Sequence, residues 1–222
     1  RVLAELSDLV AQDEPVLNSL VEILLGLDLA LARGRYGRWL GAVPPHLSED
    51  PEAPFLLRDL RHPLLIWQHK RSSGTPVVPI SVDVSAQLRV VAITGPNTGG
   101  KTVSLKSLGL AALMARAGML LPCSGQPSLP WCSQVLADIG DEQSLQQSLS
   151  TFSGHIKRIG RILHALESGP APALVLLDEV GAGTDPSEGT ALATALLKAL
   201  ADRARLTIAT THFGELKALK YT

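Results

Sequence analysis

Two kinds of apolar pattern divide the chain, one confined to the first forty residues and one spread over the rest. In the first part, an apolar stripe at helical spacing is interrupted at Asp13-Glu14-Pro15, and positions 16–32 then carry leucines on more than one helical face. The stripe consists of Val2, Leu3, Leu6, Leu9 and Val10. Because a helix that is apolar on several faces needs a partner on each of them, the pattern predicts a packed helical pair.

In the second part, short continuous apolar runs alternate with segments of helical periodicity. The runs at 88–94, 173–177 and 206–210 have the length and continuity of buried parallel strands. The segments at 102–117 and 186–202 repeat apolar residues at helical spacing. Strands that alternate with helices in this way predict an α/β fold with a largely parallel sheet flanked by helices.

A glycine-rich loop, GPNTGGKT at 95–102, joins the first of these strands to the first of these helices. It fits the pattern G-x-x-x-x-G-K-[ST], in which backbone N–H groups and a helix N-terminus surround phosphate oxygens. Lys101 is placed to reach the β and γ phosphates, and the Thr102 hydroxyl is placed to bind Mg²⁺. The predicted nucleotide-binding residues are Gly95, Pro96, Asn97, Thr98, Gly99, Gly100, Lys101, Thr102 and Val103. The loop therefore predicts a site for a nucleoside triphosphate.

Two adjacent acids, Asp178 and Glu179, follow the apolar run at 173–177. Ligands of open α/β sheets collect at the carboxyl ends of the strands, so both acids are expected beside the triphosphate. We assign Asp178 to the Mg²⁺ ion and Glu179 to the polarisation of the attacking water. The alternative is a pair of acids that faces solvent and has no role in chemistry.

Further candidates follow downstream. His212 ends the last apolar run, where it can sense the γ-phosphate, so Lys101, Glu179 and His212 form the predicted catalytic set. A lone histidine is also often no more than a satisfied polar residue. Asp185-Pro186-Ser187-Glu188 is typical of a helix start, with an N-cap, a proline in the first turn and a reciprocal glutamate. Capping accounts for Asp185 without any catalytic role.

Composition changes this picture little. The chain has 222 residues, of which 45% are hydrophobic and 18% charged, and a formal net charge of −1, which argues against a strongly basic surface. The densest basic stretch, His69-Lys70-Arg71, is interpreted as a solvated loop rather than a phosphate grip. Cys123 and Cys132 are expected to be free structural thiols. We find no apolar run near the roughly 20 residues of a membrane span, so we expect a cytoplasmic protein of bacterial type without membrane contact.

The order of motifs resembles that of ABC-type P-loop ATPases, and within them the MutS family of DNA-repair ATPases. The motifs are GPNTGGKT at 95–102, DIGDEQS at 138–144, QSLSTFS at 147–153, DEVGAGTDP at 178–186 and ATTHFGELK at 209–217. They look like the second bacterial branch of the family, the MutS two endonucleases. The resemblance implies ATP and Mg²⁺ as ligands, and a homodimer in which Ser150 completes the partner's nucleotide site in trans.

The resemblance also implies a domain organisation. Residues 1–43 correspond to the end of a helical lever and 44–222 to the ATPase domain, so we expect a fragment of a longer protein. The prolines at 44, 45 and 51 by themselves indicate a linker at 41–52. Contacts with branched or double-stranded DNA, with the ribosome in some bacteria, and any nuclease activity are then expected outside this chain. Nucleotide state would move a distant clamp in recombination control or ribosome rescue.

One departure from the family concerns the base. Mismatch-repair members commonly stack an aromatic side chain on adenine before the phosphate-loop strand, where this chain has Pro76-Val77-Val78-Pro79-Ile80. Aliphatic contacts would replace stacking, and base selectivity stays open. Two hypotheses therefore remain: an ATP-hydrolysing dimerisation domain, or a catalytically silent module that uses ATP for assembly.

Overall fold

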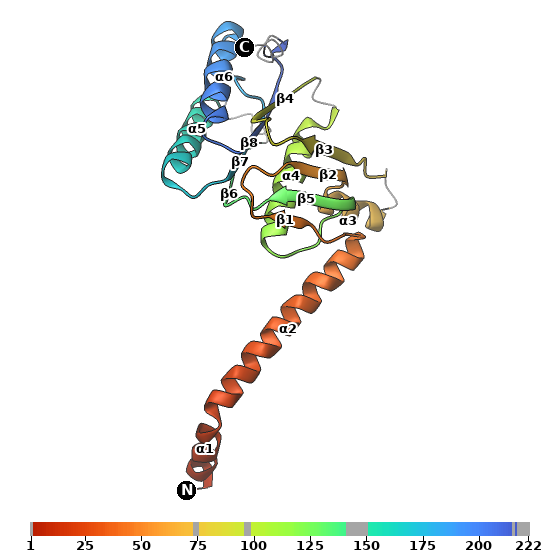
Figure 1. Ribbon diagram of the computed structural model, residues 1–222, viewed down its shortest axis with the longest axis vertical. Helices are drawn as coiled ribbons and strands as arrows, with labels where there is room; N and C mark the ends of the chain where they lie inside the picture. The colour runs from red at the N-terminus through yellow and green to blue at the C-terminus, as the bar shows by residue number, and fades with distance from the viewer. Residues whose placement is uncertain (1, 73–75, 96–98, 141–150, 215, 217–222) are drawn as a thin grey trace.

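The computed structural model describes residues 2–72, 76–95, 99–140, 151–214 and 216. Figure 1 shows a long helical rod that projects from a globular body of two sheets and their helices. The rod consists of α1 (Val2–Gln12) and α2 (Glu14–Leu40). Residues 2–40 are therefore helical, as predicted, with the predicted interruption around Asp13.

The packed helical pair that was predicted for the rod is not found. Helix α1 has no buried residue, and α2 buries only Gly37 and Leu40 at the end that meets the body. The remaining leucines of the rod are exposed, because none of the described residues outside the rod lies along its length. Helical periodicity predicted that these apolar faces pack against other segments, but it could not show whether those segments belong to this chain.

The membrane expectation also needs correction at α2. By length and composition, this helix of 27 residues is long and apolar enough to cross a membrane. Glu22 and Asp28 interrupt the apolar surface, and a charged side chain at the centre of a membrane helix costs about 3 kcal/mol. Length and composition alone do not separate a membrane span from a helix that packs against other protein segments.

One of the two sheets is all-parallel. Its strands are β4 (Val90–Thr94), β6 (Gln134–Asp138), β7 (Ala173–Leu177) and β8 (Leu206–Thr211), in the order β4-β8-β7-β6. Helix α4 (Lys101–Arg116) covers the face that carries Leu174 and Leu176, whereas α5 (Thr151–Ser168) and α6 (Pro186–Ala201) cover the face that carries Val175 and Leu177. Both faces are buried, which is why these strands appear in the sequence as continuous apolar runs.

A second sheet packs on the other side of α4. It contains β1 (His46–Ser48), β2 (Phe55–Leu60), β3 (Ile80–Val84) and β5 (Ser124–Pro130), in the order β1-β5-β2-β3. Only β1 and β5 are parallel, and α3 (Pro63–Ser72) follows β2. The single mixed sheet of the prediction is therefore two sheets, and the expected linker at 41–52 contains β1. Short polar strands such as β1 give no apolar run that would identify them in a sequence.

One buried arginine ties the two sheets together. Arg205, which directly precedes β8, is 3% exposed, and its guanidinium donates hydrogen bonds to the carbonyl oxygens of Ala53 at 2.8 Å and Leu88 at 3.0 Å. Its charged group also lies 5.7 Å from the centre of the Phe55 ring. Burial lowers the pKa of this guanidinium, which the nearby Glu52 carboxylate opposes. The carbonyl partners are the compensation that a buried cation requires.

Candidate functional site

The glycine-rich loop has the strand-to-helix setting that the sequence predicted. Strand β4 ends at Thr94, and α4 begins at Lys101 with Gly100 as its N-cap, in a left-handed conformation (φ 75°) that favours glycine. Lys101 is 5% exposed, and its ammonium donates to the carbonyl oxygen of Gly95 at 2.5 Å. The lysine thus folds back over the beginning of the loop, and the first N–H groups of α4 stand beside it.

The other loop residues follow from this placement. Thr102 is half-buried and Val103 is 40% exposed, both in the first turn of α4, and Gly99 is exposed. Pro96, Asn97 and Thr98 lie outside the described residues, and so does Ser150, the predicted trans signature. Helix α5 begins directly after that serine, at Thr151.

The two predicted acids lie at the carboxyl end of β7, and a threonine from the neighbouring strand joins them. The Thr210 hydroxyl donates to Asp178 Oδ1 at 2.5 Å and accepts a hydrogen bond from the Glu179 backbone N–H at 2.8 Å. Asp178 is 5% exposed, and its backbone N–H donates to the carbonyl oxygen of Asp138 on β6. The end of β8 therefore holds the Asp178 carboxylate, and the end of β6 holds the Asp178 backbone.

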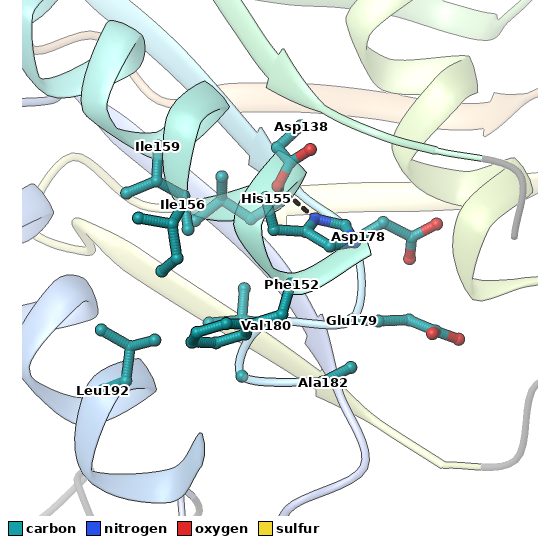
Figure 2. A pocket seen from close by; sticks show the side chains of 12 residues that line it. Asp138, Phe152, His155, Ile156, Ile159, Asp178, Glu179, Val180, Ala182 and Leu192 are labelled. Atoms are coloured by element: carbon teal, nitrogen blue, oxygen red, sulfur yellow. Dashed lines mark hydrogen bonds and ion pairs between the residues drawn. The ribbon is translucent and has the colours of Figure 1, made fainter. Parts of the chain in front are cut away.

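Glu179 has an unusual backbone conformation for its residue type. Its φ of 53° is left-handed, which costs a side chain with a Cβ atom roughly 1 kcal/mol or more. The conformation aims its carboxylate away from the buried strand, and His212 Nε2 lies 3.4 Å from Glu179 Oε1. Figure 2 shows the carboxylates of Asp178 and Glu179 pointing to the same side, away from the apolar pocket behind them. Backbone strain at a polar group of this kind is typical of functional sites.

A third acid, for which no role was predicted from the sequence, anchors α5 to the same edge. Asp138 ends β6 and is 2% exposed, and its carboxylate contacts His155 Nδ1 at 2.6 Å and Arg158 Nε. Both partners lie on α5, as Figure 2 shows for His155. Asp138 also accepts the Asp178 N–H through its backbone carbonyl, so one residue connects α5 with the predicted metal ligand. Its position at a strand end, like that of Asp178, was the available signal.

Behind the acids lies a small pocket with apolar walls. Phe152 and Ile156 of α5 face Val180, and Leu192 of α6 closes the far side (Figure 2). The turn that carries Val180 continues to Gly181, whose φ is 83° and where a Cβ would lie 2.5 Å from the carbonyl oxygen of Gly189 in α6. Only glycine fits this approach, which fixes the turn after Glu179 against α6.

The start of α6 confirms one predicted detail and corrects another. The Asp185 carboxylate accepts the Ser187 backbone N–H at 2.9 Å, as an N-cap should, and the pKa of Asp185 is lowered by its hydrogen bonds with the Ser187 hydroxyl and backbone. The reciprocal glutamate is different: Glu188 Oε2 accepts from the Thr184 hydroxyl at 2.8 Å. Asp185 therefore acts as a cap, while Glu188 ties the preceding turn to the helix.

The described residues contain no group of three or more His, Cys, Asp or Glu side chains that could hold a metal ion by themselves. A Mg²⁺ ion bound with a nucleotide needs fewer protein ligands, because phosphates and waters complete its octahedron. A buried carboxylate oxygen and a threonine hydroxyl are chemically suited to such an ion, and Asp178 and Thr102 supply these two groups.

Comparison with known proteins adds to this geometry. A family model described as MutS domain V matches residues 91–222, which is more than half of the chain. The chain belongs to the MutS family. The MutS domain thus covers all of the parallel sheet apart from the first residue of β4, together with the glycine-rich loop and the acids of β7.

Relatives extend the similarity to the rod and the second sheet. Endonuclease MutS2 of Synechocystis sp. is 58% identical over 237 residues, which cover 100% of this MutS-family chain and 29% of that protein. Endonuclease MutS2 of Symbiobacterium thermophilum is 48% identical over 222 residues, with 100% and 26% covered. Endonuclease MutS2 of Thermomicrobium roseum is 47% identical over 226 residues, with 98% and 27% covered. The chain spans less than a third of the length of these relatives.

Proposed function

We propose that this chain is a P-loop ATPase domain of the ABC type, which binds Mg-ATP at the carboxyl edge of the parallel sheet and hydrolyses it. The observation that carries the proposal is the convergence of predicted residues on that edge. Strands β4, β8 and β7 are direct neighbours, and Lys101, His212 and the pair Asp178 and Glu179 follow their ends. Each element therefore supplies a different group to one place.

In this proposal each side chain has a distinct task. Lys101 and the other loop residues at 95–103 bind the phosphates. The lysine charge and the backbone N–H groups of the loop stabilise the negative charge of the phosphate oxygens. Thr102 and Asp178 hold Mg²⁺, which when bound neutralises charge on the β and γ phosphates. Glu179 orients and polarises the attacking water, and His212, which lies 3.4 Å from the glutamate, contacts the γ-phosphate.

At the level of the whole protein, we propose residues 44–222 as the ATPase domain and 1–43 as the end of a lever. ATP-dependent pairing of two such domains, with Ser150 completing the partner's site, would move a clamp outside this chain. Membership of the MutS family and similarity to proteins named as endonucleases support a cytoplasmic role on DNA, in recombination control, and any nuclease active site is proposed outside this chain. Ribosome rescue is a further proposal that rests on the resemblance alone.

The test is Mg-ATP binding and hydrolysis by the 222-residue chain over a wide range of protein concentration, for the wild type and two variants. Lys101→Ala should abolish detectable nucleotide binding, because it removes the buried charge that faces the phosphates. Glu179→Gln should retain binding and lose about 100-fold or more in turnover, the size expected for a lost general base. Lys198→Ala, an exposed lysine of α6, is the matched control and should change neither quantity.

The concentration series separates the two functional hypotheses. Specific activity that rises with protein concentration indicates a site shared between two chains, and Ser150→Ala should then remove the rise. ATP binding without turnover at any concentration would instead favour the silent assembly module. Nucleotide binding that survives Lys101→Ala unchanged would place the site elsewhere and refute the proposal.

A further inference from the structure

Positive charge is concentrated in two segments that lie against each other where the rod meets the body. The whole chain contains 20 Lys and Arg residues and 21 Asp and Glu residues. Residues 29–48 and 61–82 together contain six Lys and Arg residues and no Asp or Glu. The rest of the chain is correspondingly acidic. The first segment ends α2 and the second contains α3, which lies beside the end of α2 in Figure 1. A net charge near zero therefore conceals a local basic surface.

The cations of this surface are interleaved with exposed aromatic rings. The ammonium of Lys70 lies 4.6 Å from the centre of the Trp39 ring, and the guanidinium of Arg71 lies 4.7 Å from that of Trp67. Tyr36 stacks on Trp39 with ring centres 6.0 Å apart. Trp39 is 38% and Trp67 is 41% exposed, so part of each side chain faces solvent beside these cations.

Two further arginines extend the surface along α2. Arg35, Arg38 and Trp39 lie three and four residues apart, which places them on one side of the helix, and all three are exposed. Among the residues that the structure describes, Arg35, Arg38, Lys70 and Arg71 form no ion pair with a carboxylate. Their charge is available to an external anion.

We propose that this basic–aromatic surface, formed by Arg35, Arg38, Trp39, Trp67, Lys70 and Arg71, binds an unpaired nucleic-acid strand. A chain of phosphates matches a row of cations without acids, and unpaired bases match exposed rings, because base stacking on aromatic side chains needs no particular sequence. Duplex bases are stacked on one another and cannot use the rings. The proposal is independent of the nucleotide site on the parallel sheet.

The experiment measures binding of fluorescein-labelled oligothymidine of about 16 nucleotides, a length typical of such surfaces, to the 222-residue chain by anisotropy. Trp39→Ala and Trp67→Ala should each weaken binding roughly fivefold or more, the size expected for loss of one stacked base. Arg35→Gln with Arg38→Gln should weaken binding and reduce the salt dependence by about 1.4 in the log–log slope. Lys70 is left intact, because its ammonium also caps the Trp39 carbonyl at the end of α2.

Matched controls come from the body. Trp131→Ala removes a tryptophan of similar exposure (43%). The double variant Lys157→Gln with Lys198→Gln removes two exposed lysines. Neither change should affect oligonucleotide binding. Oligouridine should bind like oligothymidine, and a duplex of the same length should bind more weakly. No binding of oligothymidine, or equal loss in the control variants, would overturn the proposal. A third outcome would also overturn the proposal: the arginine variant loses binding, both tryptophan variants bind like the wild type, and heparin displaces the oligonucleotide fully. This result would show that the surface binds polyanions without base stacking.

Discussion

The rod and the parallel sheet are both rich in leucine, but the leucines of the sheet are buried and those of the rod are exposed. In β7 every residue from Ala173 to Leu177 is buried, whereas Leu24 and Leu25 of α2 are 53% and 64% exposed. The strand is enclosed on both faces by helices of the same chain, while the rod meets other described residues only near its end, from about Arg33 onward. An apolar pattern therefore shows that a surface needs a cover, and only the packing shows whether this chain supplies it.

The sharpest way to break the comparison is to remove equivalent leucines from the two regions. Leu176→Ala should lower the free energy of unfolding by about 3 kcal/mol, because Leu176 is 1% exposed and the cavity left under α4 cannot collapse. Leu24→Ala should change it by less than about 0.5 kcal/mol. Urea unfolding followed by circular dichroism measures both. A cost at Leu24 as large as that at Leu176 would mean that the rod is packed in solution, for instance against a second rod.

Glycines in the two helices give a smaller but more direct contrast. In α4, a Cβ at Gly109 would lie 2.6 Å from Leu176 Cδ1, whereas a Cβ at Gly26 in α2 would meet nothing within 4 Å. Gly109→Ala should therefore destabilise the chain by about 1 kcal/mol, because the cost of overpacking exceeds the gain in helix propensity. Gly26→Ala should raise the stability of the rod by about 1 kcal/mol, because alanine is the better helix former.

Thermal unfolding and helical content by circular dichroism would record both glycine effects. Equal effects at Gly109 and Gly26 would contradict the close packing of α4 on β7.

The smallest expected effect near neutral pH concerns the thiols of the body. Burial raises the pKa of Cys123 and of Cys132 from 9.0 to about 12, with Asp59 adding to the shift at Cys123. Both should react slowly with a disulfide reagent at pH 8, whereas a thiol introduced on the rod by Ser7→Cys should react at the rate of a free thiol. Fast labelling of the native wild type would contradict this burial.

The same thiol shift has a consequence for stability. A folded-state pKa above the unfolded value favours the protonated thiol in the folded chain, so this contribution is complete below about pH 9 and is lost as pH rises towards 12. Denaturation midpoints measured between pH 7 and pH 11 should fall only in the upper half of that range, and Cys123→Ala should reduce the fall. A midpoint that does not change over the whole range would contradict the shift.

Much of the parallel sheet could be predicted because its signals are local. Buried strands need continuous apolar runs, and the start of α6 needs an acceptor such as Asp185, so both features are visible within a few residues. The position of Asp178 and Glu179 directly after a strand and that of Lys101 at the start of a helix followed from the same runs, and the structure has them there. Their roles in catalysis remain predictions that the proposed measurements test.

The polar network around these residues could not be predicted, because it depends on strand pairing. Thr210 reaches Asp178 only because β8 lies next to β7, and the two residues are 32 positions apart in sequence. Asp138 meets His155 and Arg158 because α5 packs beside β6. A buried threonine or aspartate in a strand needs a hydrogen-bond partner, but the sequence does not show which residue provides it.

The basic–aromatic surface shows the same limit for charge. The sequence contained every cation and ring, but His69-Lys70-Arg71 was interpreted as a solvated loop because its neighbours in space were unknown. The structure places this stretch in α3, beside Trp39 at the end of α2.

By itself, the sequence determined the helical rod, three of the four strands of the parallel sheet (β4, β7 and β8), the Asp185 cap and the setting of the glycine-rich loop, because periodicity and capping act over a few residues. Tertiary structure alone decided the division into two sheets, the hydrogen bonds that fix the acids of β7, and which leucines are buried. These features depend on contacts between segments far apart in the chain, and such contacts follow from the packing of whole faces rather than from any local pattern.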